Sequence, residues 1–194
     1  MGLAWTDSKF FGASDTDAGG DGRREKTILF DSIDTAGKGD LTFYGDFASS
    51  SDPSSNRFQQ DDGAVLFYST DNGLSWNSSL SFVSDRNGKG NSGHLGFRDP
   101  NIVGLKTSRT ENRSTIQGIG AANGTPLTNN FTEFSFLIPE ADSVIFKILL
   151  SFDGANEEFA FDNFRLVGAI PEPSTYALIF GAGALLVVWL RKRK

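Results

Sequence analysis

The sequence predicts an all-β fold, an antiparallel sandwich or barrel, followed by a short C-terminal helix. Three observations support the β fold: alternating runs of β-branched and aromatic residues, turn residues between the runs, and no helical periodicity before the tail. The chain has 194 residues, of which 18 are Phe and 22 are Gly. This composition is typical of many short strands joined by tight turns, and the length suits one domain with a short appendage.

Eight runs combine alternation with β-branched and aromatic residues, and we predict them as strands. Turn sequences such as Asp71-Asn72-Gly73 and Asp153-Gly154 separate several of them. Because the strands are short and joined by polar loops, they favour an antiparallel sandwich or barrel. The predicted strands are residues 27–33, 40–47, 64–70, 80–84, 113–119, 131–138, 143–152 and 158–167.

The last predicted strand has an irregular alternation. Phe159 and Phe161 lie on one face, and Phe164 shares that face only if one residue is inserted between them. The insertion falls at Asp162-Asn163. We therefore predict a β-bulge there, a feature that re-aims a side chain.

Residues 69–76, with the sequence STDNGLSW, match the pattern S-x-D-x-G-x-[ST]-W. The pattern is similar to the Asp box of sialidases, a repeated hairpin turn that lies away from the active site. Here it occurs once. We interpret it as a hairpin with Asp71, Asn72 and Gly73 at the turn and Trp76 packed beneath.

Charge and composition exclude several classes of function. Residues 1–170 hold 14 of the 18 basic and 23 of the 24 acidic residues, a net charge of −9. Nucleic-acid binding needs a basic face, so we expect no nucleic-acid partner. The chain has no Cys and one His, His94, which excludes Cys-based zinc sites and His-pair metal sites. His94 lies in the loop sequence NSGHLG, where we expect it to be solvent-exposed.

Residues 171–194 form a tail with three parts. Pro171-Glu172-Pro173 cannot extend a central strand, because proline lacks an N–H donor. The uncharged segment that follows has about the minimum length for a membrane-spanning helix, roughly 25 Å. The basic residues at the end should stay on the cytoplasmic side. The expected organisation is a sandwich at 1–168, a PEP linker at 169–173, a transmembrane helix at 174–190 and a basic cytoplasmic end at 191–194.

This order of PEP, short span and basic end resembles the PEP-CTERM sorting signal of Gram-negative bacteria that make exopolysaccharide. The resemblance implies recognition by exosortase, a membrane cysteine transpeptidase, with Pro171, Glu172 and Pro173 as a recognition site in its substrate. It also implies a cell-envelope protein, membrane-anchored before processing and then located at the cell surface or in the matrix. The alternatives are a simple single-span anchor and a buried core helix, although a core helix should show a polar face.

The start of the chain does not fit export. A signal peptide needs a basic start followed by an apolar stretch. Residues 1–26 contain no apolar run of even seven residues. We therefore expect a truncated start, or else a wrongly assigned one.

Three further stretches suggest the class of the sandwich. NEEFAFDNFRLVG, residues 156–168, resembles the closing strand of bacterial jelly-roll modules related to carbohydrate-binding and MAM-like domains. FFGASDTDAGGDG, residues 10–22, and LTFYGDFAS, residues 41–49, resemble early strands of the same modules. The resemblance implies a jelly-roll over most of residues 10–168, with glycan binding or adhesion as its role.

Three aspartates could share a Ca²⁺ ion, the one cofactor for which the sequence offers ligands. Asp15 and Asp17 lie two apart in a Gly-rich loop, and Asp162 lies at the predicted bulge. Calcium prefers several carboxylate and carbonyl oxygens, and the first loop and last strand can be neighbours in such sandwiches. In the alternative, Asp15 and Asp17 are solvated and Asp162 caps a turn.

We expect no catalytic residues, and the rival hypothesis is a glycan-active enzyme on the same fold. Glycoside hydrolysis needs two facing carboxylates, and jelly-roll glucanases carry them in an E-x-D-x-x-E strand. The nearest match, Glu140-Ala141-Asp142, has Ile145 where the second glutamate should be. Glu157 and Glu158 are adjacent, so on a strand they face opposite sides.

Overall fold

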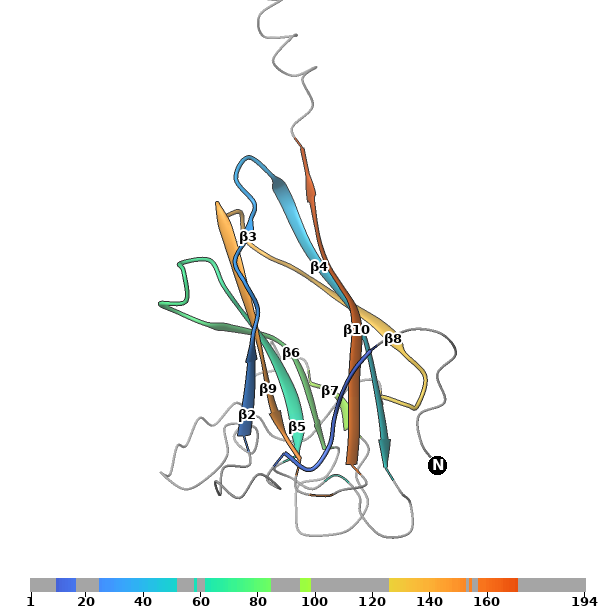
Figure 1. The fold of residues 1–194 in the computed structure, drawn as a ribbon. Coiled ribbons are helices and arrows are strands. Elements are labelled where there is room, and N and C mark those ends of the chain that lie inside the picture. Colours follow the sequence, from blue (N-terminus) through green and yellow to red (C-terminus); the bar gives the residue numbers. More distant parts are fainter. Residues whose placement is uncertain are drawn as a thin grey trace, which may run out of the picture.

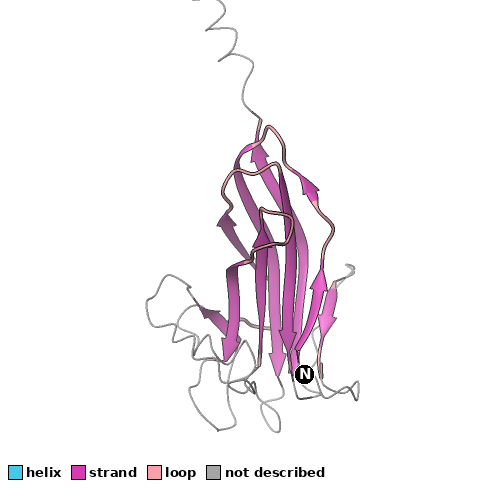
Figure 2. Cartoon of the chain, turned by 90° about the vertical axis from the view of Figure 1, so that its left-hand side faces the viewer, coloured by secondary structure: helices cyan, strands magenta, loops and turns pink. Residues whose placement is uncertain are grey.

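The computed structural model describes residues 10–16, 25–51, 58, 62–84, 95–98, 126–152, 154 and 157–170. These residues form an all-β sandwich of two antiparallel sheets, and Figures 1 and 2 show no helix in this described part. No helix within it is long and apolar enough to cross a membrane. The predicted linker motif, transmembrane segment and basic end lie outside the described residues.

The first sheet has the strand order β1-β10-β4-β8 (Figure 1). Its strands are β1 (Phe11–Ala13), β4 (Gly39–Ser51), β8 (Thr132–Leu137) and β10 (Glu157–Ala169). The second sheet has the order β2-β9-β5-β6-β7, and a short strand, β3 (Ile33–Asp34), also pairs with β9. Its strands are β2 (Glu25–Leu29), β5 (Gly63–Ser69), β6 (Asn77–Ser84), β7 (Leu95–Arg98) and β9 (Ser143–Ser151).

The strand pairs are nested within one another along the chain. β1 pairs with β10, β2 with β9, β4 with β8 and β5 with β6, and each pair is antiparallel. The chain therefore runs out through its first half and returns alongside itself through its second half. Early strands acquire their neighbours only when late strands are in place.

The predicted and observed strands agree over most of the described chain. Residues 27–33 divide into β2 and β3, whereas the other predicted strands that the structure describes correspond to single strands. The predicted strand at 113–119 lies outside the described residues. Two strands were not predicted: β1, which has three residues, and β7, which follows directly after His94.

The core between the sheets is built largely from aromatic rings. Phe43, Phe47, Phe82 and Phe159 are each at most 1% exposed. Phe47 of the first sheet and Phe82 of the second lie with ring centroids 4.6 Å apart, so the rings interdigitate across the sandwich. Aromatic pairs of this kind add about 0.5–1.5 kcal/mol to the effect of burial alone.

The predicted bulge in β10 is confirmed. The register between β10 and β4 shifts between Asp162 and Arg165, and Asn163 has a φ of 52°. The shift turns Phe164 inward, where its ring stacks on that of Phe161 at 4.8 Å. Across the sheet, a Cβ on Gly45 would lie 2.8 Å from the Phe164 ring, so this ring needs a glycine beneath it.

Candidate functional site

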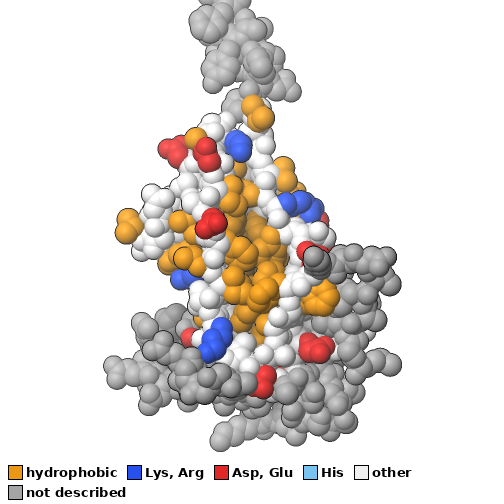
Figure 3. Space-filling view, in the orientation of Figure 1, with side chains coloured by type: hydrophobic (Ala, Val, Ile, Leu, Met, Phe, Trp, Pro, Cys, Tyr) orange, Lys and Arg blue, Asp and Glu red, His pale blue; other side chains and the backbone are white. Residues whose placement is uncertain are grey.

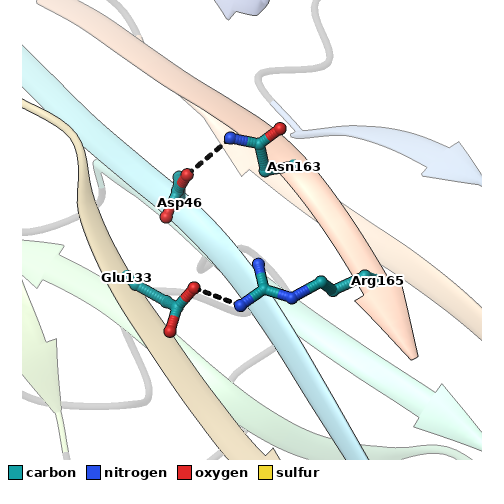
Figure 4. A network of polar contacts seen from close by, with 4 residues as sticks. All are labelled: Asp46, Glu133, Asn163 and Arg165. Atoms are coloured by element: carbon teal, nitrogen blue, oxygen red, sulfur yellow. Dashed lines mark hydrogen bonds and ion pairs between the residues drawn. The ribbon is translucent and has the colours of Figure 1, made fainter. Parts of the chain in front are cut away.

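A polar network lies on the outer face of the first sheet, beside the bulge (Figure 4). In β4, Phe43, Gly45 and Phe47 are buried, so the intervening Tyr44 and Asp46 point outward and are half-buried. Asp46 lies directly opposite Glu133 of β8 and Asp162 of β10. Residues opposite one another on neighbouring strands share a face, so carboxylates from three strands form one row.

Asn163 owes its place in the network to the bulge. Its positive φ lies in the left-handed region, which Asn tolerates better than most residues. Its backbone N–H donates to Asp162 Oδ1 at 2.7 Å, and its side-chain Nδ2 donates to Asp46 Oδ2 at 2.8 Å (Figure 4). The bulge therefore directs an amide over the neighbouring strand.

Arg165 extends across β4 to reach β8. Its Nη2 donates to Glu133 Oε2, and its Cζ lies 4.6 Å from the centroid of the Tyr44 ring. Both side chains of the ion pair are 47% exposed. A pair this exposed contributes only about 0–1 kcal/mol to stability, because water and salt screen it.

This surface offers donors and acceptors on one face of the sheet. Asp46 and Glu133 accept hydrogen bonds, Arg165 donates them, and the amide of Asn163 and the phenol of Tyr44 do both. Such a set can bind a ligand that presents several hydroxyl groups. Asp46 and Glu133 also form a cross-strand carboxylate pair, whose Cβ atoms are expected about 4.5–5.5 Å apart.

The cavity lined by described residues lies elsewhere, at the end of the sandwich where β10 ends. It has a volume of about 440 Å³, and Ala169 pairs with Gly39 on its rim. Its two acidic lining residues, Glu140 and Asp142, belong to the partial E-x-D motif. The lining residues are Gly37, Lys38, Gly39, Glu140, Ala141 and Asp142.

Of the three aspartates of the calcium hypothesis, the structure describes Asp15 and Asp162. Asp15 follows the end of β1 at Ala13 with a φ of 44°, whereas Asp162 lies beyond the other end of the β1–β10 pairing, next to Phe161 opposite Phe11. No cluster of three or more His, Asp or Glu side chains suited to a metal lies within the described ranges. Asp17 falls outside them, so calcium binding stays a prediction.

Other residues considered from the sequence have clear positions or lie outside the description. Glu157 is buried, and its Oε2 accepts the N–H of Gly154 at 2.9 Å, whereas Glu158 is half-buried. The expected opposite orientation of these two glutamates is consistent with this burial. His94 and Pro171, Glu172 and Pro173 lie outside the described residues.

The predicted hairpin at 69–76 is confirmed. It joins β5 to β6, and Asn72 and Gly73 within the loop have positive φ values of 58° and 83°, which Asn and Gly tolerate better than most residues. Hydrogen bonds from Ser75 and Ser69 lower the pKa of Asp71 from 3.8 to about 2. Trp76 packs against Lys147 of β9, whose Nζ lies 4.0 Å from the ring centroid.

Sequence reasoning missed most of the polar network. Asp162 and Asn163 were singled out at the bulge, but Tyr44, Asp46, Glu133 and Arg165 were not. The alternation of residues 41–47 places Tyr44 and Asp46 on the polar face and was the available signal. Their neighbours on β8 and β10 follow only from the strand order and register.

The comparison with known families bears on the tail. Residues 169–194 match the family model of the PEP-CTERM protein-sorting motif. The match begins at the last residue of β10 and takes in the whole predicted tail, so the predicted sorting signal is confirmed. No curated protein matches the chain.

Fold and tail together define an all-β surface protein with a C-terminal sorting signal. The PEP-CTERM motif indicates export, association with the cell envelope or surface, and targeting by exosortase.

Proposed function

We propose that the protein is a cell-surface or exopolysaccharide-matrix protein of a Gram-negative bacterium whose sandwich binds glycan. In this proposal residues 174–190 anchor the chain in the membrane until exosortase processes it near Pro171, Glu172 and Pro173. The position of the motif supports this, because the match starts where β10 ends. A processing enzyme would then act on a segment that follows the last strand without interrupting the sheets.

The strand order supports a jelly-roll fold for the sandwich. In a jelly-roll, an antiparallel ribbon of paired strands wraps into two sheets. The nested pairs β1–β10, β2–β9, β4–β8 and β5–β6 follow this scheme, and alternate pairs fall in opposite sheets. Function must still be argued from the site, since one fold serves many functions.

One observation carries the glycan proposal: Asp46, Glu133, Asn163 and Arg165 converge on one open sheet face (Figure 4), and Tyr44 lies beneath the Arg165 guanidinium. Carboxylate, amide and guanidinium groups match the hydroxyls of a sugar, and hydrogen bonds to charged groups are the stronger kind. The network contributes little to stability, because its ion pair is exposed. An open sheet face suits an extended polymer.

The role we propose is non-catalytic, and the pair Asp46–Glu133 is what favours the enzyme alternative. Retaining glycosidases hold two carboxyl groups about 5–5.5 Å apart. Here, however, Asp46 accepts from Asn163 and Glu133 accepts from Arg165. Hydrogen bonds to Asn163 and Arg165 favour a binding role for both carboxylates.

Affinity electrophoresis of the whole chain in non-ionic detergent tests the proposal. Native gels containing hydroxyethylcellulose, dextran or alginate should retard the protein in at least one case. Asp46→Asn should abolish the retardation, and Asp31→Asn, which removes the same charge from an exposed loop, should leave it unchanged. Equal mobility in all gels, or retardation that survives Asp46→Asn, would contradict the proposal, and release of reducing sugar would favour the enzyme.

A further inference from the structure

The sorting motif begins almost directly where the sheet ends. β10 is paired with β4 up to Ala169, which lies opposite Gly39. Only Ile170 separates Ala169 from Pro171. A chain spans at most about 3.6 Å per residue, so Pro171 lies within roughly 7 Å of the end of the sheet. The motif therefore cannot move far from the sandwich while β10 stays paired.

The end of β10 is packed closely against its neighbours. A Cβ on Gly168 would lie 2.8 Å from Leu41 Cδ2, so β10 and β4 approach closely there. The loop before β4 is tied to the loop before β9, because Thr35 donates its hydroxyl to Ala141 O and its backbone N–H to Asp142 O at 2.9 Å. This end of the sandwich is therefore a preformed surface to which the motif is attached.

An enzyme that binds the motif must also cover this end of the sandwich. A standard protein–protein contact buries about 800 Å² on each partner, a patch roughly 30 Å across. Residues 171–173 lie within about 14 Å of Ala169 by chain length alone. The footprint of a processing enzyme therefore extends from the motif onto the neighbouring strands and loops.

The surface in that position exposes apolar side chains. Leu137, Val167 and Ile170 are 75%, 50% and 75% exposed. Leu137 and Val167 lie in one cross-strand row, each opposite Thr42 of β4. Figure 3 shows apolar side chains among charged ones at this end of the sandwich. Exposed apolar residues are ordinary when scattered singly, but a group of them beside a recognition motif suits contact with a partner.

We propose that exosortase docks on this end of the sandwich as well as on the motif, with Leu137, Val167 and Ile170 in contact with the enzyme. This docking rests on the proposed function, because it needs a tail that exosortase processes. It adds the folded body to the features that select a substrate. The same tail attached to an unrelated body would then be processed more slowly.

Charge favours the enzyme over the lipid surface as the partner. The loops beside the apolar residues carry Asp40, Glu140 and Asp142 together with Lys38. Membrane surfaces attract basic segments, and segments that lie on them are rich in Lys and Arg. Acidic loops around exposed apolar residues therefore suit a protein partner better than phospholipid. The cavity of about 440 Å³ between the same loops would receive a side chain of that partner.

Photo-crosslinking of the whole chain tests the contact. The chain has no Cys, so Leu137→Cys introduces a single thiol that can carry a benzophenone label. Leu74→Cys is the matched control, because Leu74 is 89% exposed but lies in the β5–β6 hairpin of the other sheet. With exosortase whose catalytic cysteine is replaced, in non-ionic detergent, the label at residue 137 should form an adduct with the enzyme and the label at residue 74 should not.

Two results of this experiment would overturn the proposal. One is the absence of an adduct at residue 137, or equal adducts at both positions. The other is an adduct with lipid alone when the experiment is repeated in phospholipid vesicles, which would make the membrane surface the partner.

Processing rates in cells that co-express exosortase, with the chain behind a signal peptide, give a second test. Leu137→Asp should slow loss of the tail about fivefold or more, whereas Leu74→Asp should leave the rate unchanged. A Gly-Ser linker of about ten residues between Ile170 and Pro171 should slow the parent chain and remove the effect of Leu137→Asp. Faster processing with the linker, or an unchanged rate for Leu137→Asp, would contradict docking alone. A parent chain that keeps its tail would contradict the proposed function as well.

Discussion

The two halves of β10 belong to one strand but have different surroundings. Residues 159–161 lie between β1 and β4, and Phe159, Ala160 and Phe161 are 0%, 0% and 6% exposed. Residues 163–169 pair with β4 alone among the described strands, and their side chains alternate between exposed and half-buried. The bulge at Asp162-Asn163 separates the halves. The first half therefore serves the core, while the second presents a polar face and a free edge.

Truncating one apolar residue in each half should give the largest difference in the free energy of unfolding. Phe159→Ala should lower the free energy of unfolding by about 3–5 kcal/mol, because it leaves a cavity among the rings of Phe47, Phe82 and Phe152. Leu166→Ala should cost clearly less, since Leu166 is only half-buried. Urea unfolding of both variants measures the difference, and equal losses would mean that the second half belongs to the core.

Gly45 tests how tightly the bulge is packed against β4. Gly45→Ala should cost about 1–3 kcal/mol, because the new Cβ would lie 2.8 Å from the Phe164 ring and 3.0 Å from the Phe43 ring. Gly12→Ala is the matched control, since its Cβ would meet the Phe10 ring at an ordinary 3.4 Å. In the Phe164→Ala background the cost of Gly45→Ala should shrink, and strictly additive costs would exclude this contact.

Two substitutions at Asn163 distinguish the effect of backbone strain at the bulge from the effect of losing the side-chain hydrogen bond. Asn163→Gly and Asn163→Val both remove the hydrogen bond to Asp46, but only valine is strained at a φ of 52°. The Asn163→Val variant should therefore be less stable than the Asn163→Gly variant by about 1–2 kcal/mol in chemical denaturation. Variants of equal stability would show that the bulge relaxes when its residue changes.

The β5–β6 hairpin lies in the other sheet from β10 and serves as a reference region. The change expected there, in the pH dependence of stability, is the smallest of those predicted. The pKa of Asp71 is about 2 when folded, below the ordinary 3.8, so its ionised form contributes stability above pH 3.8. That contribution is lost as the pH falls from 3.8 towards 2. Asp71→Asn should flatten the pH dependence of the urea midpoint in this window, and a slope unchanged from the parent would contradict the hydrogen-bonded carboxylate.

Local pattern predicted most of the fold, because strands and turns depend on neighbouring residues. Alternation located β4, β5, β9 and β10, and the change of parity before Phe164 located the bulge. The three residues of β1 carry too little alternation to stand out, since its pairing with β10 defines it. A strand that exists through its partner cannot be found from its own sequence.

The candidate site was less predictable because it is a cross-strand feature. Asp46, Glu133 and Arg165 come from three strands that are far apart in the chain. Each has the ordinary appearance of an outward-facing polar residue, and only the strand order places them together. The tail is the opposite case, because its signal is a linear motif that the chain carries whole.

Tail processing tests most directly the claim that residues 169–194 are a signal and not part of the sandwich. The chain would be expressed behind a signal peptide, with and without a co-expressed exosortase, and the intact mass of the product measured. We predict loss of the tail near Pro173 only when exosortase is present, and slower loss for Glu172→Ala. Retention of the complete tail beside an active exosortase, or equal processing of Glu172→Ala, would contradict the account.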